Sequence, residues 1–223
     1  MSNITGLPKR IVRWAVFTTI LACGIFALAG RWLDPWLWVY VAMFSAVGLY
    51  AALNLDDDLA RERFRPAEPG ADRVPLKAIR LIALAHVIVG ALDYGRWHLA
   101  EVSEGLRFAG LVGTMLTLPL VFSAMLANRF FSPVVRIQKE RGHRVVDRGP
   151  YAVVRHPGYV GMITSIPFSA LVLGSWIGFA LAAAYSILIF RRVLFEDAFL
   201  RANLEGYAAY AERVRYRLVP RVW

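Results

Sequence analysis

The chain has 223 residues, of which 58% are hydrophobic, and it carries a formal net charge of +10. Soluble domains are typically about 45–50% apolar, and one soluble core of this size cannot bury the excess, so the composition favours a membrane protein. The single cysteine, Cys23, excludes an intrachain disulfide framework and a cysteine-based zinc site. The basic charge alone would suggest a nucleic-acid partner, but the hydropathy and the lack of a nucleic-acid-binding motif argue against one.

Runs that lack charged residues predict the membrane segments. In chain order they cover residues 14–29, 35–55, 78–92 (apart from Arg80), 108–128 and 156–190. A bilayer core of about 30 Å needs about 20 helical residues, so each of the first four runs, with flanking residues where it is short, fits one span. The last run would extend about 52 Å as a single helix, and the segment from Gly174 to Gly178 near its middle predicts a turn. We therefore expect an all-α membrane bundle of about six segments, the last two forming a helical hairpin.

The distribution of basic residues predicts the orientation of this bundle. With six segments, both termini lie on one side, and that side holds 23 of the 26 Lys and Arg residues. Only Arg31, Arg96 and Arg107 fall on the other side. Positively charged loops stay in the cytoplasm, so we place both termini there, in the cytoplasmic (inner) membrane if the source is bacterial. Each arginine taken alone is explained by topology and by attraction to anionic membrane lipids, which we expect as partners.

The connection between the second and third segments, residues 56–80, begins with three aspartates, Asp56 to Asp58. Three consecutive aspartates cannot all point in one direction on a helix, and no second acidic cluster of matching spacing follows. Three prolines and Gly70 in the same stretch are typical of a linker. We therefore predict a solvated connector of mixed charge and no metal site. These residues are called the connector below.

The longest polar connection, residues 129–155, is the most informative part of the chain and is called the site loop below. Its 27 residues join two membrane segments, and connections of this length are usually functional. Together with the start of the next segment it contains rigid turns at Gly149-Pro150 and Pro157-Gly158. Hydrogen-bonding and aromatic side chains lie around these turns: His143, Tyr151, Arg155, His156 and Tyr159. This combination suits a polar, charged ligand held at a membrane boundary.

A second polar feature follows the hairpin, where Arg192 and Glu196 lie four residues apart and share a helix face. Taken alone, they predict only an ion pair on a helix. Together with the site loop, however, they resemble the isoprenylcysteine carboxyl methyltransferase family. The matching elements, in order, are His143-Arg144-Val145-Val146, Gly149-Pro150-Tyr151, Arg155-His156-Pro157-Gly158-Tyr159, the hairpin, Arg192-x-x-x-Glu196-Asp197, and a tail with Gly206, Tyr207 and Tyr210. The resemblance covers about residues 143–220; it departs from the family at Asp197, where a glutamate is commoner, and residues before 128 show nothing distinctive.

The resemblance implies an S-adenosylmethionine-binding methyltransferase module at residues 128–223, after four membrane helices in residues 1–127. It implies a cytoplasmic cofactor pocket formed by the loop before the hairpin and the C-terminal helix. The residues implied to contact the cofactor are His143, Arg144, Val145, Val146, Tyr151, Arg155, His156, Pro157, Gly158, Tyr159 and Glu196. Arg192 and Glu196 are the implied catalytic residues, with Arg192 on the substrate side.

The implied reaction is O-methylation of a carboxylate on a lipophilic, isoprenylcysteine-like acceptor. A carboxylate is already ionised at pH 7 and needs no general base, and Arg192 could hold it in a bidentate contact. The same module leaves open N-methylation of a phospholipid and S-methylation of a thiol. An NADPH-dependent sterol-type reductase would be longer, and a non-enzymatic lipid-binding protein would not need clustered His and Tyr. No Gly-x-Gly-x-x-Gly motif is present, which argues against a Rossmann-type methyltransferase.

Overall fold

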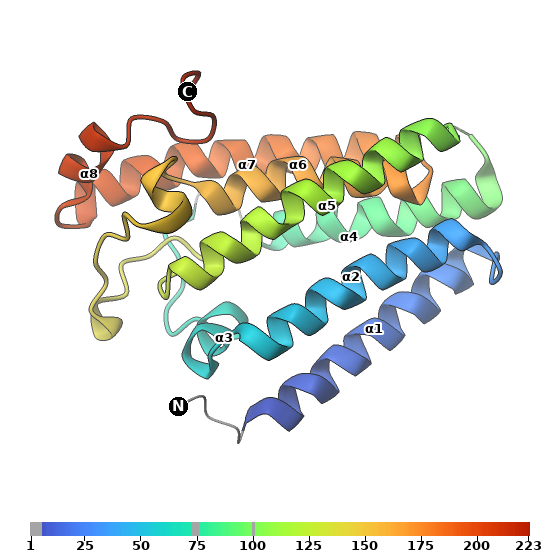
Figure 1. Ribbon diagram of the computed structural model, residues 1–223, viewed down its shortest axis with the longest axis horizontal. Helices are drawn as coiled ribbons and strands as arrows, with labels where there is room; N and C mark the ends of the chain where they lie inside the picture. The colour runs from blue at the N-terminus through green and yellow to red at the C-terminus, as the bar shows by residue number, and fades with distance from the viewer. Residues whose placement is uncertain (1–5, 73–75, 100) are drawn as a thin grey trace.

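The computed structural model describes residues 6–72, 76–99 and 101–223. Over these residues the fold is all-α, without a β-strand, and the long helices run side by side (Figure 1). The long helices are α1 (Leu7–Ala29), α2 (Pro35–Asn54), α4 (Leu76–Leu92), α5 (Glu104–Ala127), α6 (Pro157–Leu173) and α7 (Trp176–Asn203). Two short helices, α3 (Asp57–Phe64) and α8 (Tyr207–Arg213), lie between and after them. The predicted all-α bundle is therefore confirmed.

The helices have the length and the surface of membrane helices. Within the described residues, α1, α2, α5 and α7 are each long and apolar enough to cross a membrane, whereas α6 is apolar but shorter. Helix α4 continues into a π-helical turn, Asp93–Trp97. Large apolar side chains face outward, for example Ile20, Leu116 and Ile187, which are 67%, 71% and 63% exposed. Such an apolar exterior needs lipid around it, so the chain is an integral membrane protein.

The break between the last two long helices falls where the sequence predicts it. Helix α6 ends at Leu173, and Gly174 follows with φ of 91°, a left-handed conformation that glycine adopts without strain. Its N–H donates to the carbonyls of Ala170 and Leu171. The Ser175 hydroxyl then accepts the Gly178 N–H at 3.0 Å and caps α7. The predicted helical hairpin is confirmed.

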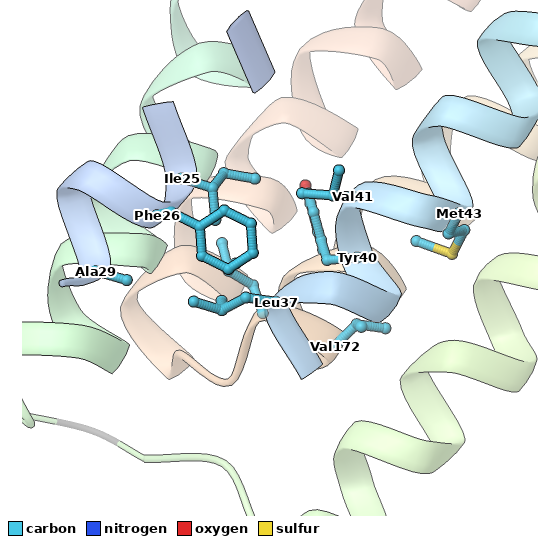
Figure 2. Packing of buried hydrophobic residues seen from close by; sticks show 9 residues of the cluster. Ile25, Phe26, Ala29, Leu37, Tyr40, Val41, Met43 and Val172 are labelled. Atoms are coloured by element: carbon cyan, nitrogen blue, oxygen red, sulfur yellow. The ribbon is translucent and has the colours of Figure 1, made fainter. Parts of the chain in front are cut away.

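Helices α1 and α2 pack onto this hairpin at the end of the bundle where it turns. Figure 2 shows Phe26 of α1, Leu37 and Tyr40 of α2, and Val172 of α6 in one buried cluster. Each of these side chains is at most 1% exposed. The first two helices are thereby fixed to the same bundle as the last two.

Helices α5 and α6 approach each other closely because glycines line their contact. A Cβ atom added to Gly110 would lie 2.7 Å from the Phe168 carbonyl oxygen, and one added to Gly161 would lie 2.9 Å from that of Thr117. The two helices carry the two ends of the site loop. Helix α3, the site loop and α8 gather at one end of the bundle, opposite the hairpin turn (Figure 1).

Candidate functional site

A cavity of about 680 Å³ lies at the end of the bundle that holds α3, the site loop and α8. This volume is in the range of small-molecule sites. Eleven of the twelve residues that the sequence predicts for the site line this cavity. The exception is Pro157, at the start of α6, which is buried but is not part of the lining.

The lining combines a polar part and an apolar part. The polar part comes mainly from the site loop and from the ends of α7 and α8, and includes Asn128, Gln138, His143, Arg144, Tyr151, His156, Glu196 and Tyr207. The apolar part comes from the membrane helices and includes Leu55, Ile79, Ala83, Phe122, Met125, Met162 and Ile189. One cavity can therefore hold a polar, charged molecule beside an apolar one.

His143 is held in a defined protonation state by its surroundings. Its Nδ1 accepts the backbone N–H of Gln138 at 3.2 Å, and its ring lies 4.6 Å from that of Phe130. Burial, together with the nearby cations Arg136 and Arg141, lowers the pKa of His143 to about 4. The ring is therefore neutral at pH 7, and because Nδ1 accepts a hydrogen bond, Nε2 carries the hydrogen. His143 is thus a hydrogen-bond donor on the cavity wall.

Tyr159 connects the two residues that the sequence predicts to be catalytic. Its hydroxyl donates to Glu196 Oε2 at 2.6 Å and accepts from Arg192 Nε at 2.9 Å. The direct helix ion pair that the spacing alone suggests is absent from the described ion pairs, because Tyr159 lies between the two groups. No described residue donates to the second carboxylate oxygen of Glu196. That oxygen remains available to an ammonium group or a hydroxyl of a ligand.

Arg192 is already bound to other parts of the chain. Its Nη2 donates to the Pro133 carbonyl at 2.6 Å and to Asp72 Oδ2 at 3.2 Å. The Asp72 carboxylate also accepts the Val135 N–H. Burial raises the pKa of Asp72, against the lowering effect of Arg192. The structure thus shows Arg192 holding a carboxylate, but one that comes from the connector.

The connector is joined to the site loop by ion pairs, so the prediction of a merely solvated connector was wrong. Glu62 and Arg136, each 4% exposed at the side chain, form a bidentate pair with distances of 2.8 and 3.2 Å. Burial opposes ionisation of Glu62, but hydrogen bonds from Arg136 and Ser132 lower its pKa. Within the aspartate triplet, Asp56 caps α3 and Asp58 accepts from Arg129 and Arg141. The missed signal was complementary charge: acids in the connector match bases in the site loop.

Arg155 and His156, predicted to contact the cofactor, are held in a buried cluster around Asp197. The Asp197 carboxylate accepts from Arg155 at 2.7 and 3.2 Å and from the Tyr207 hydroxyl at 3.0 Å. His156 Nε2 lies 3.3 Å away and Arg217 Nε 3.0 Å away. Asp197 is 1% exposed. Asp197 therefore has a structural role, because its carboxylate joins the side chains of this cluster.

The same cluster binds the C-terminal segment to the end of the site loop. Arg155 also donates to the carbonyls of Val214 and Arg215. The backbone N–H groups of Arg155 and His156 donate to the carbonyls of Tyr216 and Arg217. Both residues still line the cavity, and their contact with a cofactor stays a prediction.

Helix α8 adds two tyrosines to the wall that the sequence suggests only as part of a tail motif. Tyr207 and Tyr210 line the cavity, and the Tyr210 hydroxyl donates to the Tyr151 carbonyl at 2.8 Å. Burial raises the pKa of Tyr151, so its phenol stays neutral. The polar part thus offers a free carboxylate oxygen, a neutral imidazole N–H and aromatic rings. These groups fit the ammonium, hydroxyl and adenine groups of S-adenosylmethionine.

Comparison with known proteins shows which proteins the chain resembles. Residues 110–202 match the sequence model of the isoprenylcysteine carboxyl methyltransferase family. Protein-S-isoprenylcysteine O-methyltransferase B of Arabidopsis thaliana is 26% identical over 165 residues, which cover 65% of this chain and 78% of that protein. A probable protein-S-isoprenylcysteine O-methyltransferase of Oryza sativa subsp. indica is 30% identical, over 40% of this chain and 47% of that protein.

A third relative, protein-S-isoprenylcysteine O-methyltransferase of Schizosaccharomyces pombe, is 31% identical over 41% of this chain and 40% of its own length. The rice and Schizosaccharomyces pombe alignments therefore each span less than half of the relative. The family match begins inside α5, before the boundary after residue 127 that the sequence suggests for the module, and that boundary stays a prediction. Residues 110–202 of the chain are therefore similar to the isoprenylcysteine carboxyl methyltransferase family.

Proposed function

We propose that this chain is an integral membrane methyltransferase that uses S-adenosylmethionine to O-methylate the carboxylate of a lipophilic, isoprenylcysteine-like acceptor. The observation that carries the proposal is that polar family motifs and an apolar wall of membrane helices line one cavity. The polar part would take the cofactor, and the apolar part would take the hydrocarbon tail of the acceptor. The names of the relatives support a carboxylate over an amine or a thiol as the methylated group.

The residues would act by binding and orientation. When bound, S-adenosylmethionine supplies a methyl group activated by its sulfonium charge. An acceptor carboxylate oxygen forms the new bond to carbon as the sulfur–carbon bond breaks, and no proton moves. Glu196 would hold the ammonium or ribose end of S-adenosylmethionine. His143 would donate a hydrogen bond from Nε2 to the cofactor, and the tyrosine rings would face its adenine. Enclosure between the site loop and α8 would exclude water and align the two reactants.

We propose that the site faces the cytoplasm. The connector, the site loop and the segment after α7 carry most of the basic residues, and they lie at the same end of the bundle (Figure 1). Positively charged loops remain on the cytoplasmic side. In this arrangement the cofactor enters from water, and the acceptor enters sideways from the bilayer.

The test is methyl transfer by the purified protein in detergent micelles, with radiolabelled S-adenosylmethionine and an S-prenylcysteine acceptor. A methyl ester releases labelled methanol in base, whereas an N-methyl or S-methyl product does not.

Calorimetry should show binding of S-adenosylmethionine and not of NADPH. Glu196→Gln should weaken that binding at least tenfold, because it removes a charge-assisted contact. The control is Glu205→Gln, an exposed acid outside the cavity. Binding of NADPH alone would refute the proposal.

A further inference from the structure

Arg63, on α3 in the connector, lines the cavity without a charged or hydrogen-bonding partner among the described residues. The side chain is part-buried, and its guanidinium lies over the Phe131 ring, 5.2 Å from the ring centre. No described residue forms a hydrogen bond or an ion pair with it. The other buried arginines of the cavity, Arg136, Arg155 and Arg192, each hold a carboxylate of the chain. Among these four arginines, Arg63 is the one that holds no carboxylate of the described residues.

The surroundings of Arg63 are those of a cation that lacks an anion. Burial lowers the pKa of Arg63, and the nearby charges of Arg192 and Arg80 lower it further, while Tyr159 and Tyr185 act in the opposite direction. An arginine keeps its proton even so. A charge that is partly shielded from water and lacks a counter-ion is unfavourable, and an arriving carboxylate would relieve that cost.

The neighbours of Arg63 also indicate what kind of anion fits. Tyr159, which interacts with it electrostatically, donates to Glu196 at the polar part. Tyr185, the other such tyrosine, packs with Ile79 and Ile189 in the apolar cluster between α4 and α7. Arg63 therefore lies where the polar and apolar parts of the cavity meet. An anion bound there would have its charge toward the methyl-donor side and an apolar tail among membrane helices.

We infer that Arg63 binds the carboxylate of the acceptor. This inference rests on the proposed function and assigns the anion-binding role to a residue outside the family motifs. Arg192, with its Nε and Nη2 hydrogens directed at Tyr159, Asp72 and Pro133, then acts as a positioning residue that holds the site loop and orients Tyr159 toward Glu196.

The test compares an acid with its amide. The probes are N-acetyl-S-farnesylcysteine and the corresponding carboxamide, which differ only at the group that Arg63 would bind. Their affinities for the purified protein in detergent micelles are measured by competition against a fluorescent prenyl probe, without any methyl transfer. A hydrogen-bonded ion pair favours the acid by about ten- to a hundredfold. Arg63→Gln should bring this preference close to one by weakening the acid and leaving the amide nearly unchanged.

Two further variants make the result specific. Arg63→Lys keeps the charge without the planar fork of donors, so it should retain part of the preference for the acid. Arg61→Gln, an exposed position on the same helix, should behave like the unaltered protein. In the methylation assay, Arg63→Gln should raise KM for the acceptor about tenfold or more, while the dissociation constant for S-adenosylmethionine stays within twofold.

The outcomes separate the two proposals. If Arg63→Gln retains the preference for the acid and the KM of the unaltered protein, the inference about Arg63 is wrong and the methyltransferase assignment stands. If the unaltered protein favours the acid through Arg63 but never methylates it, the assignment fails and the carboxylate site stands. If Arg63→Gln does not fold, Arg63→Lys decides: an unchanged acid preference together with an unchanged KM overturns the inference.

Discussion

The neighbouring acids Glu196 and Asp197 should give opposite results when each is converted to its amide. Glu196 has one hydrogen-bond partner among the described residues, and its second oxygen is available to a ligand. The Asp197 carboxylate is surrounded by donors from Arg155, Arg217 and Tyr207. We expect Asp197→Asn to destabilise the fold and Glu196→Gln to weaken cofactor binding with little effect on stability.

The size of the Asp197 effect follows from burial. Asp197 and the Arg155 side chain are almost entirely shielded from water, at 2% and 1% side-chain exposure. Removing one partner of such a pair costs about 3–5 kcal/mol, because the remaining charge stays buried without compensation. For a chain of this length, that loss corresponds to a fall in Tm of roughly 10 °C.

The assay is thermal unfolding in detergent micelles, followed by tryptophan fluorescence, with calorimetry of S-adenosylmethionine binding on the same samples. Asp197→Asn should melt about 10 °C lower, whereas Glu196→Gln should melt close to the unaltered protein and bind the cofactor less tightly. An Asp197→Asn protein with unchanged Tm and lost cofactor affinity would refute the reasoning, since it would make Asp197 a ligand-binding residue.

Three further predictions concern packing, pH and the Tyr159 contact. Gly110→Ala should lower the free energy of unfolding by about 1–3 kcal/mol, because the added methyl group would push α5 away from α6. Gly105→Ala, where an added Cβ meets no atom within 4 Å, should not lower Tm. The folded pKa of His143, about 4, lies below its unfolded value, so the unfolded state binds more protons between about pH 4 and 6.5. Stability should therefore fall as the pH drops through this window, and less so in His143→Gln; equal pH dependence of the two Tm values would contradict this. Tyr159→Phe should weaken S-adenosylmethionine binding about fivefold in calorimetry, because Glu196 loses a hydrogen bond; unchanged affinity would argue against a cofactor role for Glu196.

Much of the fold is predictable because the bilayer imposes a simple rule on the sequence. A helix that crosses lipid must be long and apolar, so uncharged runs alone indicate the helices. The hairpin turn was predictable for a local reason, since Gly174 supplies the left-handed conformation that ends α6. Helix α3 was not predicted, because a short polar helix leaves no hydropathy signal.

The candidate site was predictable to the extent that it depends on short motifs. The motifs between His143 and Tyr159 and between Arg192 and Glu196 indicated two wall segments, and the fold brings them to one cavity. The partners of these residues could not be predicted in the same way. Asp72 and Arg192 are 120 residues apart, and no local pattern encodes such a pairing. The helical spacing of Arg192 and Glu196 also gave no sign that Tyr159 would lie between them.

The ion pairs between the connector and the site loop have a consequence for how such enzymes diversify. The residues implied to hold the methyl donor lie within or close to the family match, while Arg63, Glu62 and Asp72 belong to a segment outside it. Substitutions in that segment can change which acceptor is admitted without altering the donor-binding motifs. Acceptor choice and transfer chemistry could then evolve separately, on condition that the acids that anchor the connector keep their arginine partners.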